Sequence, residues 1–394
     1  MGLRKKLLVV LFMLLAAAGV LGVSYLYIEY RSEKDSKFIQ RVQQTLSLAA
    51  AGYQNRTVSL TIDGQNHSYT MEQLGEHIYY QYDENTTYEL GEEASLAELI
   101  FNGKHTVTED ELSGMVQCAA DEEAVQTVMK KLSDTYNTPP KNSRIDSSGA
   151  ITPSELGHTL DTATIHTELM TYLNQETTDH YSASYRTSTT EPEWTTEKVE
   201  KVTHVISSYS TSFGATTPRG TNIRIAASRL DNTFLLPGES ISFLDILYDD
   251  SDGKSYKKSG AYFKGKVVQA EGGGICQVST TAYDAFLIAG IIPVKRYPHS
   301  MPVSYSPLGL DSALSVGGKD LQIKNTLDVP ILVLAKTKGG RLNVHIKSYK
   351  NALKGYRYKP RAEQLSAKKA KSYLDVYKNG KKKKTIFLSK DTYD

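Results

Sequence analysis

The chain has 394 residues, of which 40% are hydrophobic and 23% are charged. This composition is typical of folded protein, and the length predicts two or three domains rather than one core. The formal net charge of +2 argues against a nucleic-acid partner. The two cysteines, Cys118 and Cys276, are too few and too far apart for a disulfide framework or a zinc ribbon. Since the sequence has no nucleotide-binding glycine pattern either, we expect neither a metal nor a cofactor.

The charge is distributed unevenly along the chain. Residues 350–394 carry 14 basic and 4 acidic side chains, a net charge of +10, and residues 1–31 carry +3, which leaves −11 between them. A basic tail on an acidic body predicts attraction to a polyanionic surface, with a solvated lysine-rich end as the alternative.

An apolar run of 22 residues extends from Leu7 to Ile28 and follows three basic residues. This is about the length of a helix that crosses a bilayer. We therefore expect residues 1–31 to form a short cytoplasmic start and a single transmembrane anchor in the cell membrane. The positive flank then places the N-terminus in the cytoplasm and the rest of the chain outside. A cleaved signal peptide is the alternative.

Composition divides the rest of the chain into three parts and a linker. Residues 32–175 predict a first domain, residues 176–196 a linker rich in Thr, Ser and Glu, and residues 197–349 a second domain. The tail, residues 350–394, contains an Asn-Gly pair at 379–380 between two β-prone segments, which is a strong hairpin signal. The expected fold class is α+β: a transmembrane helix, two extracytoplasmic domains of mostly antiparallel sheet, and a short basic hairpin.

Three local patterns predict elements inside these domains. An alternating run over residues 57–62, followed by Asp63-Gly64, predicts a β-hairpin. Helical periodicity over residues 108–134 predicts one helix that holds Cys118 as a buried, inert thiol. Alternation over residues 198–206 predicts a strand at the start of the second domain.

The most informative segment surrounds Cys276. Three glycines, Gly272 to Gly274, precede it and allow positive φ or close approach of another group. A helical pattern follows directly, which places Cys276 in the first turn of a helix. The helix dipole there favours a thiolate, and the amides around Cys276, near Gly274, together with the side chain of Gln277, are candidate donors to an oxyanion.

A cysteine nucleophile needs a base, and His299 is the best candidate. It lies between Pro298 and Pro302, which stiffen its loop. A core cysteine and an ordinary loop histidine are the alternative. His204 and His345 lie in strand-like runs and are expected to be structural, and no cluster of further ligands supports a metal site.

These motifs resemble the core of the VanW domain, a family named after accessory genes of vancomycin resistance. The similarity extends over roughly residues 200–349 and rests on several motifs in order. They are Gly272-Gly-Gly-Ile-Cys-Gln-Val-Ser-Thr-Thr281, His299-Ser-Met-Pro-Val-Ser-Tyr305, Asn222-Ile with Ala226-Ala227, Leu236-Pro-Gly-Glu-Ser-Ile-Ser-Phe243, Gly317-Gly-Lys-Asp-Leu321 and Asn325-Thr. The first domain, residues 32–175, resembles the peptidoglycan-binding module often found ahead of VanW domains, through Pro139-Pro-Lys-Asn-Ser-Arg144 and Glu155-Leu-Gly-His-Thr-Leu-Asp161.

The resemblance implies a peptidoglycan enzyme, a cysteine L,D-transpeptidase that forms 3-3 cross-links between stem peptides through an acyl-enzyme. Cys276 matches the family cysteine and would be the nucleophile, and His299 matches the family histidine and would be the general base. Ser300 and Asp311 are supporting candidates. The third, orienting group is expected to be Asp311, Glu271 or a backbone carbonyl. The family often has arginine where this chain has Leu310, so that cation is not available here to hold a substrate carboxylate.

Two other functions remain open at this level. A cysteine peptidase or amidase of peptidoglycan would use the same residues, with water in place of the acceptor amine. A non-catalytic wall-binding protein would use the glycine loop to bind glycan or peptide. In each case the expected partners are peptidoglycan stem peptides, and the basic tail suits anionic polymers of a Gram-positive wall.

Overall fold

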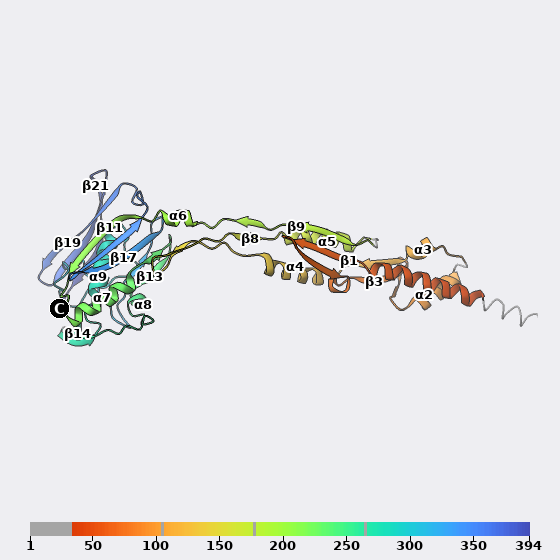
Figure 1. Cartoon of the computed structure of the whole chain (residues 1–394), viewed down its shortest axis with the longest axis horizontal. Coiled ribbons are helices and arrows are strands. Elements are labelled where there is room, and N and C mark those ends of the chain that lie inside the picture. Colours follow the sequence, from red (N-terminus) through yellow and green to blue (C-terminus); the bar gives the residue numbers. More distant parts are fainter. Residues whose placement is uncertain (1–33, 104–105, 176–178, 264–265) are drawn as a thin grey trace, which may run out of the picture. The chain divides into compact units, whose positions relative to one another are not determined.

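The computed structural model describes residues 34–103, 106–175, 179–263 and 266–394. The chain folds into two compact units (Figure 1). Unit 1 comprises the residues up to Pro139 together with Gly157–Thr190. Unit 2 comprises Pro140–Leu156 and Glu191–Asp394.

Unit 1 contains two hydrophobic clusters, each built from one three-stranded sheet and the helices that cover it. The first sheet has the order β2-β1-β9 and packs with α4 and α5, and the second has the order β4-β3-β5 and packs with α2 and a helix over residues 34–54. The elements are β1 (Thr57–Ile62), β2 (Gln65–Thr70), η1 (Glu72–Leu74), β3 (His77–Asp83), β4 (Thr86–Glu89), α2 (Glu93–Gly103), α3 (Glu109–Ser113), β5 (Val116–Ala119), α4 (Glu122–Tyr136), β8 (Gly157–Thr159), α5 (Thr162–Leu173), β9 (Tyr181–Tyr185) and β10 (Ser188–Thr190).

The structure confirms one local prediction in unit 1 and corrects another. Asp63 and Gly64 both have positive φ, as a two-residue hairpin turn between β1 and β2 requires. The single helix expected over residues 108–134 is instead α3, β5 and α4, because β5 pairs with β3 and interrupts the helical segment. Cys118 therefore lies on a strand, half-buried, with its thiol directed to the carbonyl of Leu173.

The segment expected to be a linker differs from that expectation where the structure describes it. Strand β9 pairs in parallel with β1, and β10 pairs with β8, so both belong to unit 1. Trp194, which lies in the same segment, packs instead against a small apolar cluster of unit 2. Backbone pairing thus holds the residues of β9 and β10 in place, although the Thr- and Ser-rich composition of the segment is typical of a loop.

Unit 2 is organised around helix α9 and a four-stranded antiparallel sheet of order β11-β18-β17-β12. The elements are β6 (Arg144–Ile145), β7 (Ile151–Thr152), α6 (Thr196–Glu200), β11 (His204–Ser212), α7 (Pro218–Leu230), β12 (Thr233–Leu235), β13 (Ser240–Ser242), α8 (Phe243–Leu247), β14 (Lys258–Phe263), β15 (Lys266–Glu271), α9 (Ile275–Ile288), β16 (Gln322–Lys324), β17 (Ile331–Lys338), β18 (Arg341–Ser348), β19 (Tyr356–Ser366), β20 (Lys369–Lys378) and β21 (Lys381–Thr392). The strand expected over residues 198–206 begins later, at His204, after the short helix α6.

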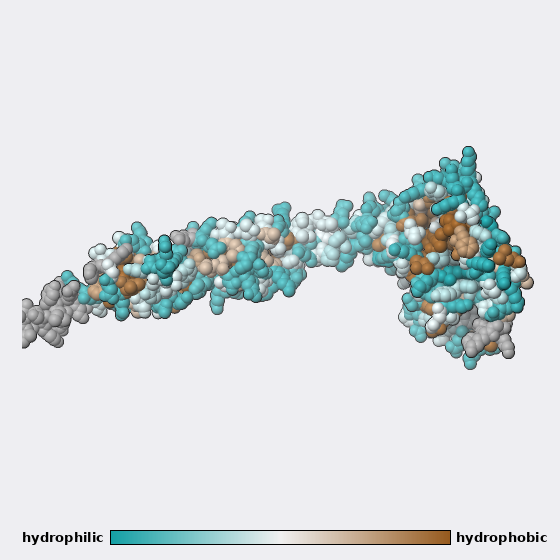
Figure 2. All heavy atoms as spheres, turned by 180° about the vertical axis from the view of Figure 1, so that it is seen from behind, coloured by the Kyte–Doolittle hydropathy of each residue, from teal (hydrophilic) through white to brown (hydrophobic). Residues whose placement is uncertain are grey.

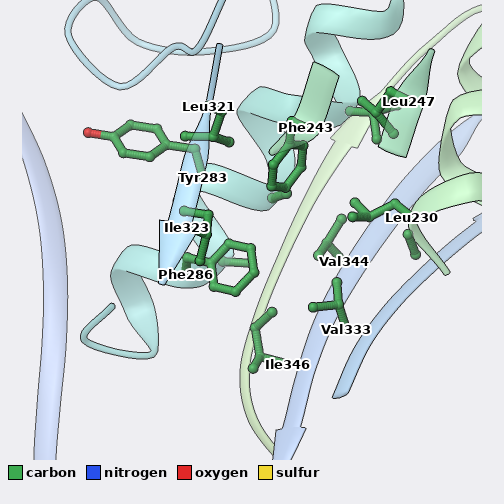
Figure 3. Close-up of a cluster of buried hydrophobic side chains, with 14 of the residues drawn as sticks. Leu230, Phe243, Leu247, Tyr283, Phe286, Leu321, Ile323, Val333, Val344 and Ile346 are labelled. Atoms are coloured by element: carbon green, nitrogen blue, oxygen red, sulfur yellow. The ribbon is translucent and has the colours of Figure 1, made fainter. Parts of the chain in front are cut away.

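The core of unit 2 fills the space between α9 and the sheet. Figure 3 shows Phe286 of α9 facing Val344 and Ile346 of the sheet, with Phe243 beside them. Every residue of α9 except Cys276 and Ile288 is buried, because the helix packs on β11 and β18 and also against β19. A helix enclosed in this way is a rigid support for a residue at its first turn.

The basic tail is more than a hairpin. The Asn-Gly turn at 379–380 does join β20 to β21, with positive φ at both residues, and β19 adds a third strand to this sheet. Leu374 of β20 is buried in the same cluster as α9, so the tail is part of unit 2. Figure 2 shows largely hydrophilic surfaces, with the largest group of hydrophobic side chains on unit 2 and smaller groups elsewhere on both units.

The expected membrane anchor is corrected. Its span, Leu7 to Ile28, lies outside the described residues, and over the part of the chain that the structure describes no helix combines the length and the apolar character needed to cross a membrane. The α+β class with mostly antiparallel sheet agrees with the structure. The prediction of a transmembrane helix was wrong, and so was the location in the cell membrane that was inferred from it.

Candidate active site

The glycine loop and α9 place Cys276 at the edge of a cavity. Gly272 and Gly274 have φ of 79° and 107°, which L side chains rarely adopt, and Gly274 is the N-cap of α9. A Cβ on Gly273 would lie 2.3 Å from the hydroxyl oxygen of Ser259, so no side chain fits there. The loop was expected to need glycine for these two reasons, and the structure confirms both.

The cavity has a volume of about 820 Å³ and contains most of the predicted site residues. Cys276, Gln277, His299 and Ser300 line it, together with Gly274 of the loop. The rival histidines, His204 and His345, lie on β11 and β18 and are not among the lining residues. The residues that bear on the chemistry also include Arg219, Tyr305 and Lys319.

His299 is held by a buried carboxylate. The Oδ2 of Asp311 lies 2.6 Å from Nδ1 of His299 and also accepts the backbone N–H of His299 at 2.7 Å. Burial raises the pKa of Asp311, but the hydrogen bonds from His299 and the charge of Arg296 outweigh this effect and hold it below its usual value. An ionised carboxylate only accepts hydrogen bonds, so Nδ1 carries a proton and Nε2 is the nitrogen left to exchange one. Of the three expected orienting groups, Asp311 is the one in contact with His299.

Four donors satisfy the two oxygens of Asp311. Besides the two groups of His299, Oδ1 accepts Nη2 of Arg296 at 3.1 Å and the hydroxyl of Tyr393 at 2.5 Å. Arg296 also pairs with Asp391, so the C-terminal strand supports the carboxylate. Asp311 is fully buried, and a charge at this depth needs such partners.

Two hydroxyl side chains of α9 fix the loop that carries Asp311. Ser279 and Thr280 are fully buried, and both donate to the carbonyl of Ser312. The N–H of Leu314 in turn points at the Sγ of Cys276, at 3.3 Å. The Ser-Thr pair of the cysteine motif therefore connects the nucleophile helix to the loop of the orienting carboxylate, a role that periodicity alone does not reveal.

Cys276 and His299 interact directly, and each shifts the pKa of the other. Burial raises the pKa of the Cys276 thiol, but the hydrogen bond and charge of His299 lower it more, aided by the Leu314 amide and Arg219. Burial lowers the pKa of His299, whereas its hydrogen bonds to Asp311 and Cys276 raise it, with a net result of about 9. At neutral pH these directions favour a thiolate beside an imidazolium, the reactive form of a cysteine nucleophile.

Gln277 differs from its expected role. Its amide nitrogen donates to Thr211 and to the carbonyl of Ser212, both at 2.9 Å, and its oxygen accepts Nη1 of Arg219 at 2.8 Å. With both amide protons engaged, the side chain has none to offer an oxyanion. The backbone amide of Cys276 at the start of α9 remains the candidate donor.

Tyr305 was not singled out as a site residue. Its hydroxyl lies 3.4 Å from Nε2 of His299, and its ring centre lies 5.6 Å from the guanidinium carbon of Arg219. Burial raises the pKa of Tyr305 well above its ordinary value, so the phenol stays protonated. Its place six residues after His299 was visible in the sequence, but nothing there indicated that the ring turns back onto the base.

The pH dependence of thiol reactivity tests this pairing. In a Cys118→Ala background, the alkylation rate of Cys276 by iodoacetamide should stay high below pH 9, the ordinary thiol value, and decline only at lower pH. His299→Gln removes the main group that lowers the thiol pKa, so the midpoint should move to higher pH. Ser300→Ala, which changes a neighbouring cavity residue, should leave the midpoint in place. Coincident midpoints for the His299→Gln and parent proteins would contradict the pairing.

The region that contains these residues matches known proteins. Residues 218–347 match the family model described as VanW like protein. The chain is 36% identical over 147 residues to "Uncharacterized protein YoaR" of Bacillus subtilis (strain 168), which covers 37% of this chain and 48% of that protein. It is 30% identical over 112 residues to "Vancomycin B-type resistance protein VanW" of Enterococcus faecalis (strain ATCC 700802 / V583), which covers 27% of this chain and 41% of that protein.

The chain therefore spans less than half the length of these curated relatives. No solved structure matches it. Cys276, His299 and Asp311 all fall within the matched residues, so the candidate site lies in the part of the chain that is similar to the VanW family model.

Proposed function

We propose that unit 2 catalyses cysteine-dependent acyl transfer on peptidoglycan stem peptides, as an L,D-transpeptidase that forms 3-3 cross-links. The observation that carries this proposal is the contact series from Cys276 to His299, which both line one cavity, and on to the buried carboxylate of Asp311. Similarity to a protein named for vancomycin B-type resistance supports a substrate in the cell wall.

The proposed reaction has two steps, and its atoms balance without an external energy source. The Cys276 thiolate attacks the carbonyl of the third stem residue, and the His299 imidazolium protonates the departing amine of a D-amino acid as the C–N bond breaks. The amine of a second stem then attacks the thioester and gives its proton to His299. The C–S bond breaks, and the thiolate is restored with a new amide formed.

Disaccharide-tetrapeptides and mass spectrometry test the proposal. We expect a dimer lighter than two monomers by one D-alanine, and its loss in Cys276→Ala. Tripeptide without dimer would show that water is the acceptor and that the protein is a peptidase. Unchanged substrate with a folded protein and a reduced thiol would refute catalysis and favour a binding role. Cys118→Ala is the matched control and should retain activity.

For the basic tail we propose binding to anionic wall polymers. Lys381 to Lys384 begin β21 and are exposed on the sheet that β19 and β20 complete. Co-sedimentation of the full chain with purified wall should weaken as salt rises, because exposed charges are screened beyond about 10 Å at 0.1 M salt. Replacing these four lysines with glutamine should weaken it at low salt, and binding insensitive to both changes would refute the proposal.

For unit 1 we propose peptidoglycan binding, on its resemblance to the module that precedes other VanW domains. Peptidoglycan that has been stripped of anionic wall polymers measures binding to the glycan without binding of the tail to those polymers. Retention of the four-lysine variant on such glycan is the expected result, and its loss from the pellet would refute the role.

A further inference from the structure

The proposed reaction gives no role to the positive charge of the cavity. Two cationic side chains, Arg219 and Lys319, line it beside Cys276 and His299. Among the described lining residues Glu271 is the acidic one, and it is exposed, so water screens its charge. Arg219 and Lys319 are half-buried, where a charge acts more strongly on a neighbouring group.

Arg219 is held in a defined position next to the nucleophile. It lies in the first turn of α7, and its Cγ is 3.0 Å from the place that a Cβ on Gly274 would occupy. Gln277 binds its Nη1, and the ring of Tyr305 lies under the guanidinium group. Its charge reaches Cys276, since it helps to lower the thiol pKa. A guanidinium fixed on one side in this way presents its remaining N–H groups in a set direction.

Lys319 approaches from a different loop. Its Nζ donates to the carbonyl of Pro298 at 2.7 Å, directly before His299. Leu310, where family members often have arginine, is 6% exposed and belongs to the hydrophobic core. The cations of this site therefore come from α7 and from the loop before β16.

We infer that Arg219, assisted by Lys319, binds a substrate carboxylate close to the carbonyl that Cys276 attacks. The substrate class is then a peptide with a carboxylate near the scissile bond, either the terminal carboxylate of the departing residue or a side-chain carboxylate of the stem. Arginine recognises a carboxylate through charge-assisted, directional hydrogen bonds. The inference deepens the proposed function and rests on it for the position of the scissile bond.

Two alkylating reagents test the subsite without any peptide. In the Cys118→Ala background, the rate of Cys276 alkylation by anionic iodoacetate is divided by the rate with neutral iodoacetamide. Any change in the thiol pKa affects both rates equally, so this ratio reports attraction of a carboxylate. Arg219→Met should lower the ratio about tenfold and Lys319→Met less, whereas Arg219→Lys should keep part of it. Arg224→Met removes the same charge from an exposed position of α7 that does not line the cavity, and should leave the ratio unchanged. An equal ratio in Arg219→Met and the parent would overturn the inference.

Calorimetry with the Cys276→Ala protein distinguishes the two sources of the carboxylate. The probes are acetyl-L-Ala-γ-D-Glu-L-Lys-D-Ala, its C-terminal carboxamide, and the analogue with the glutamate carboxylate amidated. We expect one amide to bind more weakly than the acid and the difference to vanish when Arg219→Met is added. Equal binding of all three would overturn the inference. If the alkylation ratio depends on Arg219 but the protein forms no thioester with the peptide, the proposed function is refuted and the carboxylate subsite is supported.

Discussion

Asp311→Asn should reduce the rate of acyl-enzyme formation by up to about 10⁴-fold, the loss known when the orienting aspartate of a nucleophile–histidine–aspartate triad becomes asparagine. The carboxylate accepts hydrogen bonds from four donors in His299, Arg296 and Tyr393. An asparagine must turn its NH₂ group toward two of these donors whichever way it is oriented. His299 then loses its tautomer or its position, while Cys276 is unchanged.

The control for Asp311→Asn is Asp391→Asn. Asp391 shares Arg296 with Asp311 and also accepts the hydroxyl of Ser389. It should therefore lower kcat much less than Asp311→Asn does. The measurement is thioester formation by mass spectrometry over time, with the pH profile of Cys276 alkylation as a second readout. Asp311→Asn within threefold of the parent rate would refute its orienting role.

Arg296→Met should destabilise unit 2 by about 3–5 kcal/mol. Arg296 forms ion pairs with Asp311 and Asp391, and the three side chains are 6%, 1% and 6% exposed. Its removal leaves two buried carboxylates without their main partner, and methionine fills the space without supplying a charge. Trp194, the sole tryptophan, packs in unit 2, so its fluorescence during urea unfolding reports that unit.

Lys141→Met serves as the comparison for this stability measurement. Lys141 pairs with Glu155 in the same unit, but both side chains are more than 60% exposed. Such a pair contributes at most about 1 kcal/mol. If the free energy of unfolding fell equally in the two variants, the buried ion pairs of Arg296 would contribute no more to stability than an exposed pair.

Local signals in the sequence singled out Cys276 and His299, which line one cavity in the structure. Three glycines before a helical pattern placed Cys276 at the start of α9, and two prolines singled out His299. The two Gly-containing turns at 63–64 and 379–380 followed from backbone sterics alone. Each of these predictions depends on residues close together in the sequence, where φ preferences and periodicity act directly.

Contacts between distant segments could not be predicted in this way. Arg219 is 57 positions from Cys276, and Tyr393 is 82 positions from Asp311. No periodicity links such residues, so the support of the carboxylate by the tail was not foreseen. The expected helix over residues 108–134 failed for a related reason, because pairing of β5 with β3 overrode local helical preference.

The support of Asp311 by Tyr393 and Arg296–Asp391 has a consequence for biosynthesis. A ribosome makes Cys276, His299 and Asp311 well before it reaches Asp391 and Tyr393. A nascent chain that lacks Asp391 and Tyr393 contains Cys276 and His299 but only part of the network around the buried carboxylate. If unit 2 transfers acyl groups as proposed, it therefore becomes competent only after β21 has been synthesised and has joined the sheet, which delivers the final donors to Asp311.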